Sequence, residues 1–342
     1  MSKLGNLWKT LLAGGAGMAA LAAVNASIQR RVLEPDDSAL GGDARFFNWK
    51  DGQIFYKEAG LNNPGLPVVF IHGVGAGVSS FMWRKNFDEL SKDFRVYAFD
   101  LLGFGFSDKP PAAPYSADLY VDLISDFIRE VAGGRANVVA SSLGASYAVR
   151  VADEHPELIE AMVLNAPVGY DTLNTRPGMA GAAFYGLLQS PVLGTSFYNV
   201  MASERSIRDY ARRTLFYDHR RVTDRFVSHV YATSHQPGAQ HAIAAFLSGY
   251  LNCDMRAAFS RLDQRMVLVW GKQDPTTPVA KALALIELNS RARLEVFDYC
   301  RMLPEQEQPE RFNKLVRETF KQQTYRDQHD ERADTKYRAA GE

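Results

Sequence analysis

Cysteine and net charge are both scarce in this chain of 342 residues. Its two cysteines, Cys253 and Cys300, cannot build a disulfide framework, and two free thiols are the simpler interpretation. No Cys-x-x-Cys motif or Cys/His cluster is present, so the sequence predicts no metal centre, and it carries no signature of another cofactor. Lys plus Arg and Asp plus Glu both number 39, without the basic excess typical of nucleic-acid binding. We therefore expect no metal, no cofactor and no nucleic-acid partner.

Charge is also absent from a stretch near the N-terminus. Residues 10–29 carry no charged side chain, and residues 11–24 are only apolar residues and glycine. About 20 apolar residues can span a bilayer as a helix, which favours a membrane anchor and a membrane-associated protein. Two alternatives stay open. One is a peripheral or packed helix, which allows a cytoplasmic protein, and the other is a signal peptide cleaved near Val24-Asn25-Ala26, which implies a secreted one.

The rest of the chain alternates between strand-like and helix-like sequence. Helical patterns such as residues 118–132 separate short apolar runs, and Asp51-Gly52 between two alternating runs indicates a hairpin. Continuous apolar runs are typical of parallel strands covered on both faces, so we predict an α/β fold with a mostly parallel, doubly wound sheet. The runs are PVVFIHG, FRVYAFD, ANVVASS, AMVLNAP, RMVLVWG and RLEVFDY.

This alternation stops between residues 169 and 262, where helical and aromatic sequence predominates. We interpret residues 169–262 as a helical cap inserted into an α/β core made of residues 44–168 and 263–320. Residues 1–43 form the apolar N-terminal segment and a Gly-rich linker. Residues 321–342 are polar and of mixed charge, which indicates a solvated tail.

A serine follows the third of these strand runs. Ala140-Ser141-Ser142-Leu143-Gly144 leads directly into a helical pattern and fits the small-x-Ser-x-Gly form of a nucleophile elbow. Small residues such as Gly144 suit a sharp turn at which strand and helix pass close together. The motif predicts Ser142 as a nucleophile. The alternative is an ordinary strand-to-helix turn with a capping serine.

A glycine-rich loop, HGVGAG at residues 72–77, follows the first run. Gly73 and Gly75 let the backbone approach a substrate closely, so the loop would support an active site. In an acyl-transfer site the N–H groups of Val74 and Leu143 would point at a developing oxyanion. A plain glycine-rich turn is the alternative, whereas a phosphate loop is disfavoured because GxxxxGK[ST] is absent. We interpret His72 as a structural histidine of the turn.

Together with DLLGFGFSDKP at residues 100–110, these motifs resemble the α/β-hydrolase superfamily over about residues 44–320. The resemblance implies an α/β-hydrolase fold, a cap over the site and a Ser–His–acid mechanism. It also implies a triad acid at Asp274, which follows a strand run and would orient the histidine. An aspartate in a surface turn is the alternative interpretation.

The same resemblance places Met302 where the family has its catalytic histidine. The following sequence matches the family form through Phe312 without a gap, and no histidine lies between His241 and His329. A serine hydroxyl is a weak nucleophile without a base, and a thioether has negligible basicity. A site with Met302 would therefore hold Ser142 without its normal proton acceptor.

Other groups could replace the imidazole. His235 and His241 lie in the predicted cap, which would face the site. Asp298 and Glu305 are close to position 302 in the sequence, but carboxylates are weak bases unless their pKa is raised. Cys300 is either a buried small apolar residue or a reactive thiol.

Two functions follow from these observations. The first is an esterase-like hydrolase of a small apolar ester that uses Ser142, with a triad lacking histidine. The second is a non-catalytic pseudo-hydrolase, whose capped pocket binds a small apolar molecule or a protein partner. Enzymatic activity therefore depends on which group, if any, accepts the Ser142 proton in place of the imidazole that is absent from position 302.

Overall fold

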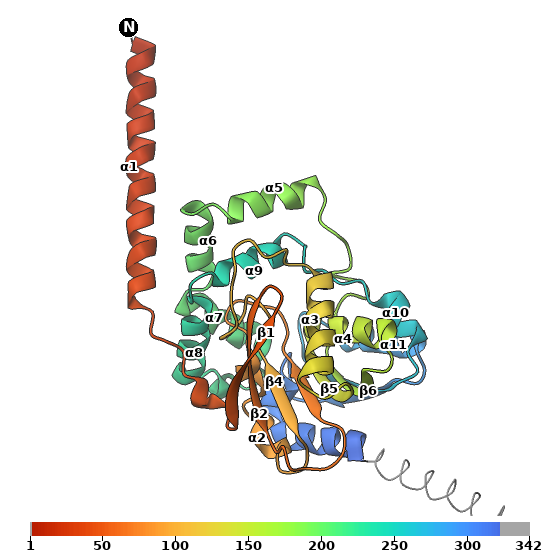
Figure 1. The fold of residues 1–342 in the computed structure, drawn as a ribbon. Helices are drawn as coiled ribbons and strands as arrows, with labels where there is room; N and C mark the ends of the chain where they lie inside the picture. The colour runs from red at the N-terminus through yellow and green to blue at the C-terminus, as the bar shows by residue number, and fades with distance from the viewer. Residues whose placement is uncertain (1, 322–342) are drawn as a thin grey trace, which may run out of the picture.

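The computed structural model describes the backbone of residues 2–321, with side chains from residue 15 onward apart from that of Asp37. An eight-stranded sheet runs through the molecule in the order β1-β2-β4-β3-β5-β6-β7-β8 (Figure 1). β1 (Asp43–Trp49) and β2 (Gly52–Ala59) form the predicted antiparallel hairpin, and β2 pairs antiparallel with β4. All other neighbours are parallel. The remaining strands are β3 (Val68–Ile71), β4 (Val96–Phe99), β5 (Ala136–Ser141), β6 (Ile159–Asn165), β7 (Arg265–Gly271) and β8 (Arg293–Phe297).

These strands confirm the predicted fold class, because each of the six apolar runs forms one strand. β3 and β4 are buried at every position, as expected for strands covered on both faces. Alternate residues of β3 pack into two separate apolar cores: Val69 and Ile71 into one, Val68 and Phe70 into the other. The sheet is therefore the middle layer of three.

Helices supply the two outer layers of the core. α3 (Ala117–Glu130) and α4 (Ser142–Glu154) contribute to the core on one face. The short helix α2 (Phe87–Leu90) and the helix at residues 309–321 contribute to the core on the other. The remaining core helices are α11 (Val279–Leu288) and α12 (Pro304–Glu307). α10 (Arg256–Arg261) lies within the predicted cap range, but its Ala258 and Phe259 belong to the same apolar core as α3 and α4.

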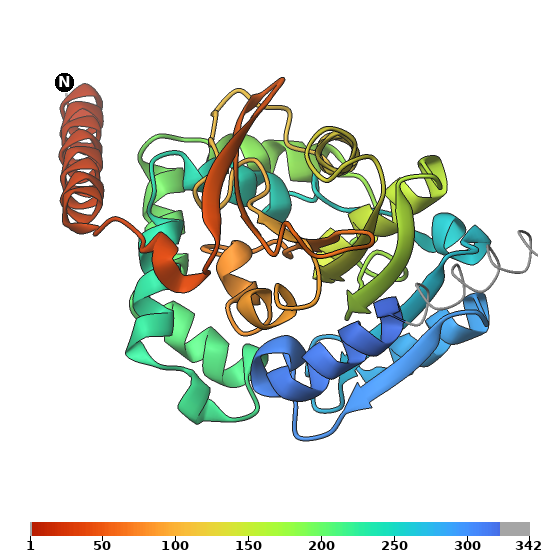
Figure 2. The ribbon, with the colours of Figure 1, turned by 60° about the horizontal axis from the view of Figure 1, so that its bottom comes forward.

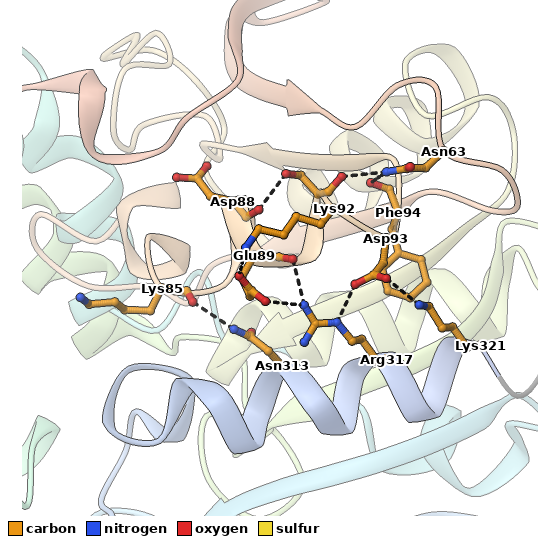
Figure 3. A network of polar contacts seen from close by, with 11 residues as sticks. Asn63, Lys85, Asp88, Glu89, Lys92, Asp93, Phe94, Asn313, Arg317 and Lys321 are labelled. Atoms are coloured by element: carbon orange, nitrogen blue, oxygen red, sulfur yellow. Dashed lines mark hydrogen bonds and ion pairs between the residues drawn. The ribbon is translucent and has the colours of Figure 1, made fainter.

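The helix at residues 309–321 is clamped to the end of α2 by charged side chains (Figure 3). Arg317 binds Asp93 through Nε at 2.6 Å and Glu89 through Nη2 at 2.8 Å. Lys321 also binds Asp93, at 2.6 Å. Hydrogen bonds from Lys92 and then Arg317 lower the pKa of Glu89, and those from Lys321 and then Arg317 lower the pKa of Asp93. The clamp anchors the helix that directly follows α12. Position 302 lies in the loop just before α12.

A helical insert lies between β6 and β7, in agreement with the cap expected from sequence. Its helix α8 (Asp224–Ser234) touches the glycine-rich loop, because a Cβ atom on Gly77 would overlap the Val230 carbonyl oxygen. The insert therefore reaches the loop that follows β3, and its exact boundaries at residues 169 and 262 stay a prediction. Its helices are α5 (Met179–Leu188), α6 (Leu193–Met201), α7 (Glu204–Tyr210), α8 (Asp224–Ser234) and α9 (Ala239–Leu247).

The N-terminal segment forms the long helix α1 (Ser2–Arg31), which stands beside the body and projects past it (Figures 1 and 2). The predicted anchor over residues 10–29 lies within α1, and the side chains of its first five residues are outside the described set. Among the residues that were described, no helix combines the length and the apolar character needed to cross a bilayer, so a spanning anchor is not supported. The tail predicted at residues 321–342 lies outside the described residues beyond Lys321.

Candidate active site

The turn at residues 140–144, here called the elbow, joins β5 to α4. Ser142 is the first residue of α4 and has a φ angle of 53°, in the left-handed region that favours glycine. A residue other than glycine persists there only when its surroundings hold it. This sharp strand-to-helix turn is the conformation that presents a serine hydroxyl at the edge of a sheet.

Two glycines allow the loop after β3 to pack against the elbow. A Cβ atom on Gly73 would lie 3.1 Å from the Cβ of Ser142, and one on Gly144 would overlap the carbonyl oxygen of His72. The two loops therefore meet backbone to backbone. The requirement for small residues, inferred from the motif, has a direct steric cause here.

The predicted oxyanion donors lie at this contact. Leu143 is the second residue of α4, where a helix leaves its N–H groups without an intrahelical acceptor. Val74 follows Gly73 in the loop, and within the described chain its N–H has no backbone acceptor. The half-buried Ser142 hydroxyl has no hydrogen-bond partner among residues 15–321 either. One free hydroxyl and two free N–H donors therefore lie on neighbouring residues.

His72 is buried beneath this loop and uses both ring nitrogens. Nδ1 lies 2.6 Å from the Gly73 carbonyl oxygen, to which it donates, and Nε2 accepts the Leu101 N–H at 3.0 Å. Burial lowers the pKa of His72, against an opposing effect of the Asp100 charge, so the ring is neutral. These bonds support the predicted structural role and leave His72 no free nitrogen to act as a base.

The predicted acid lies in the turn at residues 271–277, the acid loop, directly after β7. Asp274 is buried, and its own turn supplies its hydrogen bonds. Oδ1 accepts from the Thr276 N–H at 2.8 Å and from the Thr276 hydroxyl at 2.7 Å. Oδ2 accepts from the Thr277 hydroxyl. Both carboxylate oxygens are thus bonded without a histidine.

The loop at residues 298–308, the 302 loop, packs on the acid loop. A Cβ atom on Gly271 would overlap the Arg301 carbonyl oxygen, so only glycine fits without movement. Gln273 donates its N–H to the Cys300 carbonyl at 2.9 Å and accepts the Cys300 N–H on its side chain at 3.0 Å. These contacts place position 302 next to the loop that carries Asp274.

Asn165 connects the 302 loop to the elbow. It ends β6 and pairs in register with Ser141 of β5. Its Nδ2 lies 3.3 Å from the Ser141 hydroxyl and 3.3 Å from the Met302 carbonyl oxygen, donating to both. The elbow, the acid loop and the 302 loop therefore meet at one edge of the sheet. Sequence analysis missed Asn165, although a polar residue that ends the strand next to the elbow was a usable signal.

The side chain at position 302 belongs to an apolar cluster. Met302 is half-buried and packs with aromatic and aliphatic residues from the cap and from the start of the core. The place that the motif assigns to an imidazole thus holds a flexible apolar group, which fills space and accepts no proton. The members of this cluster include Phe81, Met82, Ile207, Phe216, Phe226, Val230 and Leu303.

Comparison with known proteins identifies the scaffold. Residues 67–308 match the family described as "alpha/beta hydrolase fold". The chain belongs to the α/β-hydrolase fold family. The match includes the elbow, the acid loop, the 302 loop and the insert.

Within this family the hydrolase is similar to enzymes named for 2-hydroxy-dienoate-type substrates. It is 31% identical over 261 residues to 2-hydroxymuconate semialdehyde hydrolase of Pseudomonas sp. (strain CF600), covering 74% of this chain and 86% of that one. It is 27% identical to 2-hydroxy-6-oxo-2,4-heptadienoate hydrolase of Pseudomonas putida, covering 74% and 88%. The solved meta-cleavage product hydrolase of Pseudomonas fluorescens IP01 is 28% identical with a TM-score of 0.69, covering 84% and 99%. The protein is therefore a serine-hydrolase-type α/β-hydrolase close to the meta-cleavage product hydrolases.

Two of the four histidines in residues 169–262, His235 and His241, bond to neighbouring residues of the cap. Nδ1 of His235 lies 3.0 Å from the Ser234 hydroxyl and 2.9 Å from the Tyr231 carbonyl oxygen. Nδ1 of His241 lies 2.7 Å from Oε1 of Gln189. Burial lowers the pKa of both imidazoles. No contact in the described residues links either ring to Ser142, so the structure gives no support to a cap base.

Asp298 and Cys300, which lie close to position 302 in the sequence, are poor proton acceptors for opposite reasons. Hydrogen bonds from Gln273 and then Lys272 lower the pKa of the Asp298 carboxyl to about 2. Burial raises the pKa of the Cys300 thiol well above its ordinary value, so this cysteine stays protonated. The structure supports the interpretation of Cys300 as a small buried residue.

Glu305 differs from both of these groups. It is 1% exposed, and its Oε2 accepts from Nδ2 of Asn165 at 2.9 Å, while its Oε1 has no partner in the described chain. Burial raises the pKa of this carboxyl to about 8, although the nearby Arg84 charge opposes the shift. Glu305 thus titrates near neutrality and shares one amide with the elbow and with Met302. Glu305 forms no hydrogen bond with Ser142 itself in the described residues.

A cavity of about 520 Å³ borders the 302 loop rather than the elbow. It is lined by Tyr217, Asp218, His219, Arg220, Arg221, Tyr299 and Glu307, and it contains no residue of the elbow. We place the candidate site at the elbow, because chemistry needs reactive and stabilising groups that converge rather than volume alone. In the described residues, no cluster of His, Cys, Asp and Glu is arranged to hold a metal ion.

Proposed function

We propose that this chain hydrolyses a small, aromatic-derived carbonyl compound of the 2-hydroxy-6-oxo-dienoate class, with Ser142 at the reacting carbonyl. The motifs in the sequence by themselves favoured an ester substrate. The relatives are named for oxo-dienoate and semialdehyde substrates, which moves the proposal toward a ketone-type carbonyl. Both substrate types develop negative charge on one oxygen, so the same oxyanion hole serves either of them.

The observation that carries the proposal is the arrangement at the elbow. Ser142 is held at a φ of 53° with a free hydroxyl, beside a loop that packs directly against it. The N–H groups of Val74 and Leu143 would bind the carbonyl oxygen of the substrate. An ordinary turn with a capping serine would not need a strained residue with an unpaired side chain.

We expect the reaction to be slow, because in the described residues no imidazole is hydrogen-bonded to Ser142, and position 302 holds a methionine. In a serine protease, loss of one triad member lowers turnover by as much as about 10⁶, and about 10³–10⁴ over water remains from the oxyanion hole and binding. We expect this chain to retain activity of that residual size. Asp274, bonded to its own threonines, would act as a structural residue.

A second function, binding without turnover, is favoured by one specific observation. Both oxygens of Asp274 accept hydrogen bonds, and Met302 packs into an apolar cluster. Each residue is therefore stably accommodated without a catalytic histidine. A pseudo-hydrolase of this kind would bind the same carbonyl compound at the elbow and release it unchanged.

Hydrolysis of a chromogenic 2-hydroxy-6-oxo-dienoate by purified protein separates the two functions. The unaltered chain should turn over slowly, Ser142→Ala should abolish this activity, and Met302→His should accelerate it. Met302→Leu is the matched control, because it changes the side chain but supplies no base. Thermal melting of each variant shows whether the fold is kept.

Equal rates for the unaltered chain and the Ser142→Ala variant would rule out hydrolysis by Ser142. If the compound still bound in that case, the pseudo-hydrolase would be the correct function. Absence of both binding and turnover would overturn the proposed substrate class.

A further inference from the structure

Two segments that are far apart in the sequence lack charged residues and nevertheless remain exposed. One is residues 10–29 in α1, whose exposure is described from residue 15 onward, and the other is residues 177–203, which hold α5 and α6. Other charge-free stretches, such as residues 59–83, are mostly buried in the core. Exposed, charge-free sequence is unusual on a monomeric surface and marks an interaction site when it is contiguous.

Side-chain hydrogen bonds of Asn25 and Gln29 join the two segments, and this set of bonds is here called the polar notch. Asn25 of α1 is 9% exposed, and its Nδ2 donates to the Val192 carbonyl at 3.1 Å and to the Ser196 hydroxyl at 3.0 Å. Its Oδ1 accepts from Nδ2 of Asn199 at 3.0 Å. Gln29 adds a bond to the His235 carbonyl at 2.8 Å. These bonds dock the C-terminal part of α1 on α6, so the two apolar segments form one surface.

α5 presents apolar side chains to solvent on most of its surface. Only Leu188 of its ten residues is buried, whereas Met179 is 92% exposed and Leu187 is 51% exposed. A helix that is apolar all round is normally covered. α6 continues the surface with Leu193, Phe197 and Val200, all of which are exposed.

Within the part of α1 whose side chains are described, the helix is exposed on every side before the notch. Residues 15–24 are ten consecutive exposed positions, which is nearly three helical turns, and all of them are apolar or glycine. Figure 1 shows this helix projecting past the layer of α5 and α6. A protein partner covers one face of a helix, whereas the acyl chains of a lipid bilayer can surround all of its faces.

Basic residues border the charge-free surface. Arg30 and Arg31 end α1, Arg176 precedes α5, and Arg205 follows α6. All four are exposed, and Arg176 and Arg205 also form surface ion pairs with Asp118 and Asp209. Cationic side chains beside an apolar surface attract anionic lipid headgroups. The charged residues from 171 to 213 are five arginines and three acids: Asp171, Arg176, Glu204, Arg205, Arg208, Asp209, Arg212 and Arg213.

From this juxtaposition we infer that α5, α6 and the exposed part of α1 form a lipid-binding face, with a phospholipid bilayer as its occupant. α5 and α6 lie against the bilayer, and α1 enters the acyl region without crossing it. This mode differs from the spanning anchor expected from the sequence. It also does not depend on Ser142, because none of these residues belongs to the elbow, the acid loop or the 302 loop.

The lipid-binding face is tested by flotation of the full chain with phosphatidylcholine vesicles, with and without phosphatidylglycerol. We expect the chain to float with the vesicles, and more of it with the anionic ones. Leu187→Asp should lower the bound fraction about tenfold, since it places a charge in the apolar face. Leu283→Asp is the matched control, because Leu283 on α11 is 54% exposed but lies outside this face. Leu21→Asp tests α1 in the same way.

An unaltered chain that does not float would overturn the inference, and so would equal losses from Leu187→Asp and Leu283→Asp. Light scattering addresses the alternative that a second copy covers the face. A dimer that Leu187→Asp dissociates, without vesicle binding by the unaltered chain, would assign the face to self-association. Binding that is lost in Leu187→Asp but kept in Ser142→Ala would separate this inference from the proposed hydrolysis.

Discussion

The elbow and the 302 loop meet at the same edge of the sheet but are built differently. The elbow keeps a reactive side chain in a strained backbone, with Ser142 at a φ of 53°. The 302 loop holds an unreactive methionine and is anchored by groups other than that side chain. Glu307 accepts the Arg301 N–H at 2.8 Å, and Asn165 donates to the Met302 carbonyl. A loop held by its backbone can exchange its reactive residue without losing its place.

Glycine-to-alanine changes at the two loops should have the largest effect. Gly144→Ala would drive a Cβ atom into the His72 carbonyl, and Gly271→Ala would drive one into the Arg301 carbonyl. We expect each to lower the free energy of unfolding by about 3 kcal/mol or more, because backbone must move. Urea denaturation measures the loss. Gly186→Ala, in the exposed helix α5 with open space around it, is the control. A loss at only one loop would show that the two are not equally dependent on backbone contact.

Removal of the connecting amide should have the next largest effect. Asn165→Ala deletes the donor shared by Ser141, Met302 and Glu305, and it leaves a buried carboxyl without its partner. We expect a loss of about 2 kcal/mol, measured by urea denaturation at neutral pH. An unchanged stability would mean that the elbow and the 302 loop are held independently.

Glu305 should make stability depend on pH. Its pKa in the folded chain is about 8, above its ordinary value of 4.5, so the folded state binds more protons between these values. The contribution is complete below about pH 4.5 and is lost as the pH rises through about 8. Relative to Glu305→Gln, the unaltered chain should therefore lose stability, by a few kcal/mol at most, between about pH 5 and about pH 9. Parallel melting curves over this range would contradict the raised pKa.

The smallest expected effect is the backbone strain at the elbow itself. Ser142→Gly and Ser142→Ala both remove the hydroxyl, but only glycine adopts a φ of 53° without cost. We expect the glycine variant to be about 1 kcal/mol more stable than the alanine variant. Differential scanning calorimetry resolves such a difference. A more stable alanine variant would show that Ser142 is not strained.

The fold could be read from local sequence because its signals are local. Each of the six apolar runs became a strand, and Asp51-Gly52 made the predicted hairpin turn. The lack of a histidine near position 302 was likewise visible in the sequence. Asn165 could not be assigned a role in this way, since its partners Ser141 and Met302 are brought to it only by strand pairing and loop packing.

The sequence by itself determined the order of elements, the motif around Ser142 and the absence of an imidazole from the 302 loop. Only the tertiary structure decided that Asp274 is bonded by its own threonines, that His235 and His241 bond to neighbours within the cap, and that Glu305 is buried with a raised pKa. The tertiary structure also decided that α1 docks on α6 by a polar notch and leaves apolar surface uncovered. The physical reason is that periodicity reports which residues avoid water, whereas proton affinity and exposure depend on neighbours distant in the chain.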